Sequence, residues 1–437
     1  MNERDSEIMA QSLTQHGYRE IKEMHSADLI IINTCSIRAK AEQKVMSLLG
    51  MLRKEKTERP ELKICVAGCV AQQEGEQLLE RMPHVDLIIG TQNIYNIHKL
   101  LEKHLRGNNV ITSMSDTYTI PRFIPEFPQN NPDVPSLAEI KPFKKFVTIM
   151  QGCNNFCTYC VVPYTRGREI SRKKGDILDE IKVLVENGIR EICLLGQNVN
   201  SYGLANKVTE DGSPYFFPML LKDAACISGL KRLRFTTSHP KDLSDDLIQC
   251  FQEIEILCHQ IHLPVQTGSD SILKKMNRKY TRASYLQKID SLRSYCPDIA
   301  ITTDIIVGFP GETDEDFEQT MRLLEQVRFD GSFSFKYSDR PGTKSRLLDG
   351  KVIEKIKSER LSRFQARQDE ISLEKNSALI GKTLAVMVES VCANGFQGRS
   401  EFNHVVHVES MISHTPGELI DVLIIHAGQH SLQGKFF

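Results

Sequence analysis

Three closely spaced cysteines are the residues of this sequence best suited to chemistry: Cys153, Cys157 and Cys160, in the pattern C-x3-C-x2-C. They follow a short apolar run, so they are expected in a loop where three thiolates can turn toward one centre. Three thiolate ligands on a four-iron cluster leave one iron open, and an open coordination site is what a substrate or cofactor needs. The spacing therefore predicts an iron–sulfur cluster with one free iron.

A structural zinc site and ordinary packing of three thiols are the alternatives to such a cluster. A zinc site needs a fourth ligand, and residues 161–190 contain no His or Cys. A ferredoxin would likewise add a fourth cysteine to close its cluster, and none follows nearby. The three cysteines therefore favour an iron–sulfur cluster with one free iron over these alternatives.

Two further cysteines each follow an apolar run near the N-terminus. Cys35 comes after residues 28–33 and Cys69 after residues 62–66, and both runs are predicted strands of a parallel sheet. The carboxyl ends of parallel strands are where such sheets bind ligands, so Cys35 and Cys69 are predicted to share a site. Two unrelated buried thiols are the alternative. Cys65 lies inside its strand and is expected to face the core.

A basic cluster follows the central cysteines, formed by Arg166, Arg168, Arg172, Lys173 and Lys174. Its position near the mouth of the predicted site suits contacts with the phosphates of an RNA loop. A solvated face without a function is the alternative.

The first segment, residues 1–120, alternates short apolar runs with helical patterns, which predicts an open α/β sheet. Ser6 is expected to be the N-cap of a helix that carries Ile8, Met9 and Leu13. Residues 121–142 predict an extended linker, because prolines stand at positions 121, 125, 128, 132, 135 and 142.

The second segment, residues 143–370, repeats a strand and a helix, which predicts an incomplete parallel (β/α)6 barrel with its chemistry at the carboxyl ends of the strands. The expected strands are residues 146–150, 191–195, 232–235, 260–263, 300–307 and 332–335. His239 follows the third strand; such a residue is more often a structural hydrogen-bonding group than a general base.

The last segment, residues 373–437, changes to an alternating pattern with glycines between the runs, which predicts a small β-barrel. The whole chain is thus expected to be α/β with a third, all-β part.

Composition limits the class of protein. The formal net charge is −1, so nucleic-acid binding requires a local patch. No stretch is apolar enough to span a membrane, and the charged N-terminus does not resemble a signal peptide. A cytoplasmic protein is expected, and the 12 cysteines are then more often ligands, catalysts or core residues than disulfides.

The central cysteine spacing is similar to the signature of the radical S-adenosylmethionine superfamily. With both sets of cysteines considered, the chain resembles the methylthiotransferase family within it, most closely the synthases of 2-methylthio-N6-dimethylallyladenosine in tRNA. The matching stretches are MNERDSE, NTCSIR, KAEQKV, GCVAQQEGE, CNNFCTYCVVPYTRGRE, LLGQNVN, FTTSHP, HLPVQTGSD and DIIVGFPGET. The C-terminal segment resembles the TRAM domain of this family.

The resemblance implies two [4Fe–4S] clusters and S-adenosylmethionine. Cys153, Cys157 and Cys160 would hold the cluster whose open iron binds S-adenosylmethionine, and Cys35 and Cys69 would belong to a second cluster that serves in sulfur delivery. Residues at the ends of the central strands would contact the cofactor; the candidates are Gln197, Asn198, Ser238, Gln266 and Gly308. No catalytic residue beyond these is assigned.

The resemblance also implies a substrate and partners. Such enzymes add a methylthio group to C2 of adenosine 37 in tRNA, so the anticodon loop of tRNA is the expected partner. An electron donor such as flavodoxin or ferredoxin and a monomeric state are also expected. The alternatives are a relative that acts on threonylcarbamoyladenosine of tRNA or on an aspartate of a ribosomal protein, and a truncated, non-catalytic chain.

One departure from the family concerns the second cluster. The family's first cysteine lies two residues before the methionine that corresponds to Met1, so this ligand is absent from the sequence. The expectation is that the sequence starts at an internal methionine and lacks one strand of the N-terminal sheet together with the third ligand.

Overall fold

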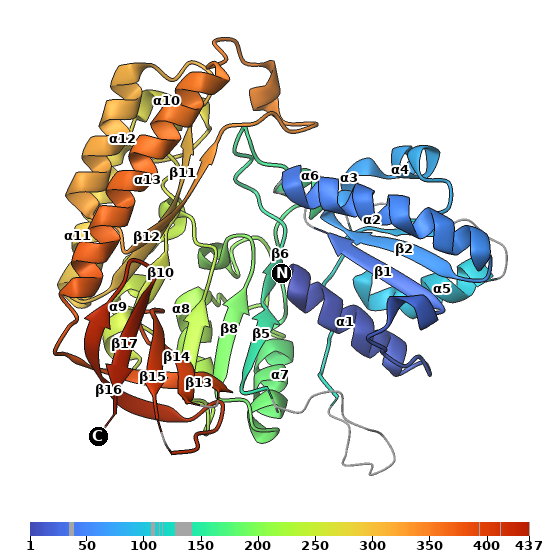
Figure 1. Ribbon diagram of the computed structural model, residues 1–437, viewed down its shortest axis with the longest axis horizontal. Coiled ribbons are helices and arrows are strands. Elements are labelled where there is room, and N and C mark those ends of the chain that lie inside the picture. The colour runs from blue at the N-terminus through green and yellow to red at the C-terminus, as the bar shows by residue number, and fades with distance from the viewer. Residues whose placement is uncertain are drawn as a thin grey trace. The chain divides into compact units, whose positions relative to one another are not determined.

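A computed structural model of the chain describes residues 1–34, 39–105, 110–112, 114–115, 117–126, 142–392, 394–410 and 412–436 (Figure 1). The chain divides into two compact units. The first comprises Met1–Glu126, Met150–Asn154 and Cys160–Arg172, and the second comprises the rest. Within the described ranges, no helix combines the length and the apolar character that crossing a membrane demands.

The first unit is built on a parallel sheet of order β1-β2-β3-β4. Its strands are β1 (Leu29–Thr34), β2 (Lys63–Gly68), β3 (Leu87–Ile89) and β4 (Val110–Ile111). Its helices are α1 (Asn2–Thr14), α2 (Ala39–Glu58), α3 (Cys69–Glu74), α4 (Glu76–Arg81), α5 (Ile97–Leu105) and α6 (Val162–Thr165). The short strands β6 (Met150–Gln151) and β7 (Ile170–Ser171) form an antiparallel pair in the same unit.

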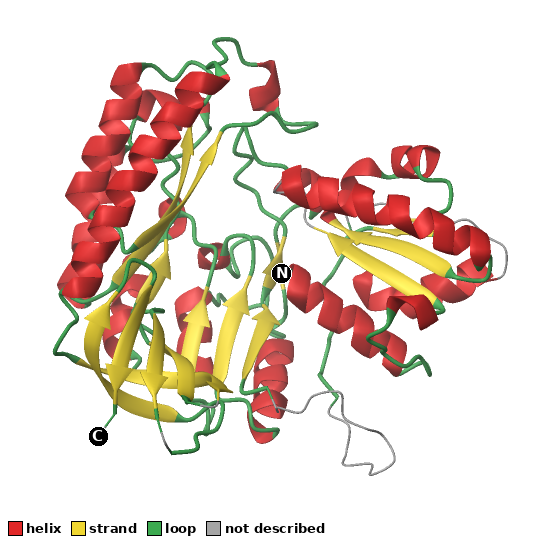
Figure 2. Cartoon of the chain, viewed as in Figure 1, coloured by secondary structure: helices red, strands yellow, loops and turns green. Residues whose placement is uncertain are grey.

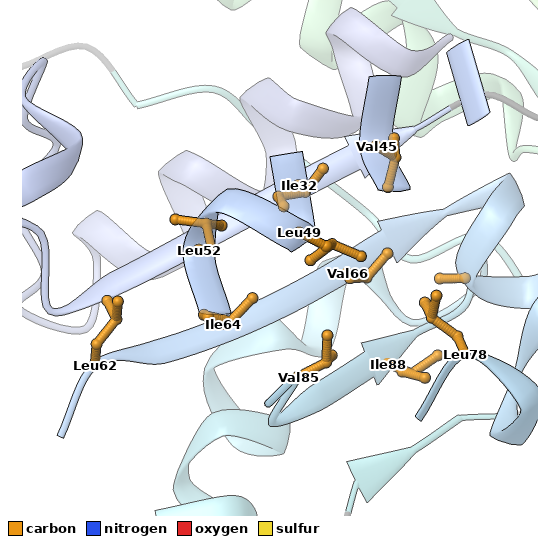
Figure 3. Packing of buried hydrophobic residues seen from close by; sticks show 11 residues of the cluster. Ile32, Val45, Leu49, Leu52, Leu62, Ile64, Val66, Leu78, Val85 and Ile88 are labelled. Carbon is orange, nitrogen blue, oxygen red and sulfur yellow. The ribbon is translucent and has the colours of Figure 1, made fainter. Parts of the chain in front are cut away.

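Successive residues of β2 point to opposite faces of this sheet, and helices cover both faces. Ile64 and Val66 pack against residues of α2 such as Leu49 (Figure 3). Cys65 and Ala67 face the other layer, which includes α1 and α5. The predicted open α/β sheet is therefore confirmed, as is the burial of Cys65.

The helix α1 differs from its prediction. It begins at Asn2 with Met1 at the N-cap position, so the expectation that Ser6 caps the helix is wrong. Ser6 lies inside the helix, and its hydroxyl accepts a hydrogen bond from Asn33 Nδ2 at 2.9 Å. Ile8, Met9 and Leu13 lie on this helix as expected, and all three are buried.

The second unit contains the predicted incomplete barrel (Figure 2). Its strands are β5 (Lys144–Thr148), β8 (Glu191–Leu195), β9 (Arg232–Phe235), β10 (Gln260–His262), β11 (Ala300–Val307) and β12 (Gly331–Lys336). All neighbours pair in parallel, and a bridge between Leu233 and Leu257 joins the two halves. Among the described residues β5 does not pair with β12, so the barrel stays open.

Helices connect these strands, as the period of the sequence predicts. They are α7 (Lys174–Glu186), α8 (Phe217–Ala225), α9 (Asp245–Glu253), α10 (Asp270–Lys275), α11 (Arg282–Tyr295), α12 (Asp314–Val327) and α13 (Glu354–Ser377). The loops after β10 and β11 are tied together by Asp316, which accepts hydrogen bonds from Ser271 at 2.7 Å and from Thr313, the N-cap of α12. The strand-end loops are thus fixed to the helices that follow them.

The C-terminal residues form a closed barrel of order β13-β14-β15-β17-β16, which confirms the predicted small β-barrel. Its strands are β13 (Thr383–Cys392), β14 (Gly395–Ser400), β15 (Val405–Glu409), β16 (Leu419–Ala427) and β17 (Ser431–Lys435). It packs on β9, because Arg232 donates to the carbonyl of Arg399 at 2.6 Å and Arg234 to that of Ser400 at 2.7 Å.

Candidate active site

The loop with the three central cysteines follows β5, as predicted. Cys153, Cys157 and Cys160 are all partly exposed and form no disulfide. The N–H of Cys153 donates to the carbonyl of Gly167 at 3.2 Å. Gly152 has φ 80°, and a Cβ there would overlap the carbonyl of Arg168, so only glycine allows the chain to pass. In the described part of the chain no three His, Cys, Asp or Glu side chains are already arranged to hold a metal ion.

A guanidinium lies against one of these cysteines. Arg278 Nη1 donates to Cys157 Sγ at 3.4 Å, and Arg278 itself is only 7% exposed. The hydrogen bond joins the cysteine loop to the residue that follows the turn after α10. Arg278 could not be identified from the sequence, because nothing in its local pattern distinguishes it from the surface lysines beside it.

Unpaired polar atoms gather at the ends of β8 and β9. Asn198 and Asn200 follow β8, and Ser238 and His239 follow β9. Four buried atoms find no hydrogen-bond partner among the described residues: Asn198 Oδ1, Asn200 Oδ1, Ser238 Oγ and His239 Nε2. An unpaired buried polar group is costly, and such groups in a native fold call for a ligand, an ion or water. These atoms therefore point to a polar ligand at this edge of the sheet.

The remaining cofactor candidates lie in the same strand-end loops but differ in their surroundings. Gln197 is half-buried. Gln266 is 7% exposed, and its N–H and carbonyl both bond to β11. Gly308 donates its N–H to Glu312 Oε1 at 2.8 Å, and a Cβ there would overlap the side chain of Lys357. Glycine at position 308 thus makes room for Lys357.

His239 has one structural bond and one unpaired nitrogen. Its Nδ1 accepts from the N–H of Lys241 at 3.2 Å. Burial lowers the pKa of His239 to about 2, and the charges of Arg278 and Lys241 act in the same direction. The imidazole is therefore neutral. Its Nδ1 accepts a backbone hydrogen bond, which is the structural role expected of His239.

The N-terminal cysteines differ in how well they can be placed. Cys35 lies outside the described residues. Cys69 is the first residue of α3, directly after β2, and is 5% exposed. The preceding Gly68 has φ 91°, and a Cβ there would overlap Asn33 Oδ1 on β1. The ends of β1 and β2 therefore approach each other closely at Gly68, and Cys69 follows the end of β2, as predicted from the sequence.

Arg166 lies beside Cys69 in the first unit. Its Nη2 donates to Asp5 Oδ2 at 2.6 Å and to Asn2 Oδ1 at 3.3 Å, and the arginine is 4% exposed. Burial lowers the pKa of Arg166, but Asp5 and Cys69, which both interact with the guanidinium, raise it above its ordinary value. Arg166 thus faces a cysteine, as Arg278 does in the second unit.

The predicted basic patch is wrong for two of its five members. Arg166 and Arg172 are 4% and 2% exposed, because each donates to acceptors inside the first unit rather than to solvent. Arg168 and Lys173 are exposed, and Lys174 is half-buried. The sequence could not distinguish the buried members of this cluster from the exposed ones, because the burial of Arg166 and Arg172 depends on acceptors elsewhere in the fold.

Two family models match the chain. The model of the Radical SAM superfamily matches residues 147–324, and that of the Uncharacterized protein family UPF0004 matches residues 1–90. Among solved structures, the radical S-adenosylmethionine methyltransferase TsrM from Kitasatospora setae is similar with a TM-score of 0.57 over 91% of this chain and 77% of that chain. At 14% identity this likeness shows the fold.

Curated relatives match along the whole chain. The tRNA-2-methylthio-N(6)-dimethylallyladenosine synthase of Desulfotalea psychrophila is 59% identical over 100% of this chain and 96% of its own length. Those of Syntrophobacter fumaroxidans and Geobacter metallireducens are 48% and 46% identical, over 100% of this chain and 93% and 96% of their own lengths. The chain belongs to the family of tRNA-2-methylthio-N(6)-dimethylallyladenosine synthases, within the radical S-adenosylmethionine superfamily.

Proposed function

We propose that this chain adds a methylthio group to C2 of N6-isopentenyladenosine at position 37 of tRNA by radical S-adenosylmethionine chemistry. The observation that carries the proposal is the identity along the entire chain with synthases named for this product. The central and N-terminal parts both match, so the likeness covers more than the shared radical fold.

Cys153, Cys157 and Cys160 would hold a [4Fe–4S] cluster. Three partly exposed thiols in one loop suit this role, and Arg278 Nη1 donates a hydrogen bond to Cys157 Sγ. The cluster, with S-adenosylmethionine at its open iron, would supply the one-electron reduction that releases a 5′-deoxyadenosyl radical.

The polar atoms at the strand ends would bind S-adenosylmethionine. Asn198 has its amide nitrogen engaged by Asp242 at 2.7 Å and by Ser201 at 3.0 Å, which leaves its oxygen to accept from the methionine ammonium. The Ser238 hydroxyl has no partner among the described residues and can donate or accept. Gln197 and Gln266 would contribute further contacts. Gly308 would act through its lack of a side chain, which makes room for Lys357.

The N-terminal unit would carry the second cluster, and Cys35 and Cys69 would be two of its ligands. Cys69 stands at a strand end beside a buried guanidinium, as the thiolate ligand of a cluster should. This second cluster would take part in sulfur delivery.

The partner would be the anticodon loop of tRNA, and the reaction would draw its electron from a donor such as flavodoxin or ferredoxin. We expect the chain to act as a monomer. The exposed Arg168 and Lys173 are the members of the basic cluster that can reach RNA phosphates.

Mass spectrometry of tRNA nucleosides from cells with and without the gene tests the proposed function. Loss of the methylthio group from isopentenyladenosine, with accumulation of the unmodified isopentenyl form, is expected. Loss of the methylthio group from threonylcarbamoyladenosine instead, or from an aspartate of a ribosomal protein, would identify the alternative substrates.

A further inference from the structure

The turn at the end of α10 holds the loop of the central cysteines. Thr158 donates its N–H to the carbonyl of Met276 at 3.1 Å and its hydroxyl to that of Lys275 at 2.9 Å. Asn277 Nδ2 donates to the carbonyls of residues 155 and 156 at 3.2 and 3.0 Å. Four hydrogen bonds therefore fix the backbone on both sides of Cys157.

Arg278 follows this turn and reaches Cys157 in a fixed orientation. Nη2 donates to the carbonyl of Pro264 at 2.6 Å, Nε to Tyr280 Oη at 2.8 Å, and Nη1 to Cys157 Sγ at 3.4 Å. Tyr280 Oη in turn donates to the carbonyl of Val265 at 2.9 Å. The guanidinium is thus anchored on the loop that ends β10, and its remaining edge meets the sulfur.

The charge of Arg278 is not neutralised by the groups it bonds. Its three acceptors are a carbonyl, a phenol and a sulfur, none of which is a carboxylate. The residue is 7% exposed, so water screens it little. Of the three groups that Arg278 bonds among the described residues, the Cys157 sulfur is the one that suits a metal, so the positive charge acts on that sulfur and on the metal that it binds.

We propose that Arg278 is a positioning residue that raises the reduction potential of the cluster held by Cys153, Cys157 and Cys160. The inference rests on the proposed function, which places the cluster there. Reduction adds one electron to the cluster, taken from an external one-electron donor, and breaks no bond. The potentials of such clusters depend on net charge, hydrogen bonds to sulfur and exposure. An N–H donated to a ligand sulfur, with a positive charge behind it, stabilises the more negative, reduced state.

Arginine suits this role better than lysine. Its planar fork offers donors in fixed directions, so one side chain can bond Pro264, Tyr280 and Cys157 together. A lysine ammonium would keep the charge but could not reproduce this arrangement. The two variants Arg278→Gln and Arg278→Lys therefore separate the loss of charge and geometry from the loss of geometry alone.

The test is the midpoint potential of the cluster in the full-length, iron-reconstituted protein, followed by electron paramagnetic resonance during a dithionite titration. The signal that changes when S-adenosylmethionine is added identifies the relevant cluster. For Arg278→Gln we expect the ratio of reduced to oxidised cluster at a fixed potential to fall about tenfold, which is 59 mV for a one-electron couple. Arg278→Lys should lie between Arg278→Gln and the wild type.

The control is Lys279→Gln, which removes the same charge from the neighbouring, exposed position. It should leave the potential unchanged. A wild-type potential in Arg278→Gln, with the cluster loaded, would overturn the proposal. If that variant holds no iron, a wild-type potential in Arg278→Lys would overturn it equally. Either result leaves the proposed function intact, because the wild-type protein would still modify its tRNA.

Discussion

At the scale of single residues, two buried arginines and a small set of unpaired polar atoms define what the site can do. Arg278 and Arg166 each meet a cysteine, one in each unit. Both are held by acceptors far away in the sequence, 121 positions for the pair Arg278 and Cys157 and 161 for Arg166 and Asp5. Such contacts depend on tertiary packing. The candidate cysteines could therefore be identified from their spacing in the sequence, whereas the arginines that contact them could not.

The ion pair between Arg166 and Asp5 should be important for stability. Both side chains are almost fully buried, so Arg166→Gln leaves a buried carboxylate without its charged partner. We expect a loss of about 3 kcal/mol or more in the free energy of unfolding of the first unit, measured by urea denaturation. The exposed Arg168→Gln is the control and should change stability by less than about 0.5 kcal/mol. Equal stability of the two variants would show that the pair contributes nothing.

Ser238 should contribute to ligand binding without contributing to stability. Its buried hydroxyl has no partner among the described residues, so Ser238→Ala removes an unpaired group and should leave the unfolding free energy unchanged or raise it. If the hydroxyl bonds S-adenosylmethionine, affinity measured by equilibrium dialysis should fall about threefold to tenfold. Ser294→Ala, on the exposed face of α11, is the control. Unchanged affinity in Ser238→Ala would remove this residue from the binding site.

At the scale of elements, the carboxyl ends of parallel strands place the described candidates Cys69, Asn198 and Ser238. The strands 191–195, 232–235 and 300–307 were predicted at the limits that the structure has, because each is a short run flanked by a turn-forming glycine: Gly188, Gly229 and Gly308, respectively. The short pair β6 and β7 was missed, since two-residue strands carry no periodic signal. The prediction at Ser6 was wrong for another reason. Serine is a common N-cap, but here the helix begins earlier and the Ser6 hydroxyl accepts a hydrogen bond from Asn33 on β1.

Gly68, at the end of β2, should be required for the position of Cys69. Gly68→Ala would combine a backbone conformation that is nearly restricted to glycine with an overlap onto Asn33 Oδ1. We expect a loss of about 3 kcal/mol in unfolding free energy, together with lower iron content of the reconstituted protein. Gly188→Ala is the matched control, because φ is 96° there and nothing lies within 4 Å of a new Cβ. It should cost about 1 kcal/mol. An equal effect of the two substitutions would contradict the role of the close approach.

Strand β12 carries two exposed aromatic side chains, Phe333 and Phe335, and Phe333 is paired in register with Asp304 of β11. Ser334 accepts from Gln365 of α13, so Phe333 and Phe335 lie on the opposite face of the strand. Phe333 is 55% exposed although it lies in the barrel sheet, and its ring is 5.9 Å from that of His262. The exposure of a phenylalanine at this place is accounted for if the isopentenyl chain packs on it.

For Phe333→Glu we therefore expect KM for isopentenyl-modified tRNA to rise about tenfold or more, while formation of 5′-deoxyadenosine without tRNA stays unchanged. The control is Leu373→Glu, which changes an exposed residue of α13. A wild-type KM in Phe333→Glu would exclude this face from substrate binding.

At the scale of the whole molecule, the sequence predicted three architectures in the right order, since periodicity changes from helical to alternating where the chain passes into the C-terminal barrel. It could not predict that arginines of β9 anchor that barrel, because the acceptors are backbone carbonyls that any sequence provides. Family membership rests on the likeness over the whole chain, and the strand-end chemistry agrees with it.

The central claim is that this chain uses the cluster at Cys153, Cys157 and Cys160 to methylthiolate isopentenyladenosine. The most direct measurement incubates the anaerobically reconstituted protein with S-adenosylmethionine, dithionite and isopentenyl-modified tRNA, and follows nucleosides by mass spectrometry. The wild type should form 5′-deoxyadenosine and 2-methylthio-isopentenyladenosine, and Cys157→Ala should form neither. Formation of the methylthio product by Cys157→Ala, or its absence from a wild-type protein that still releases 5′-deoxyadenosine, would contradict the claim.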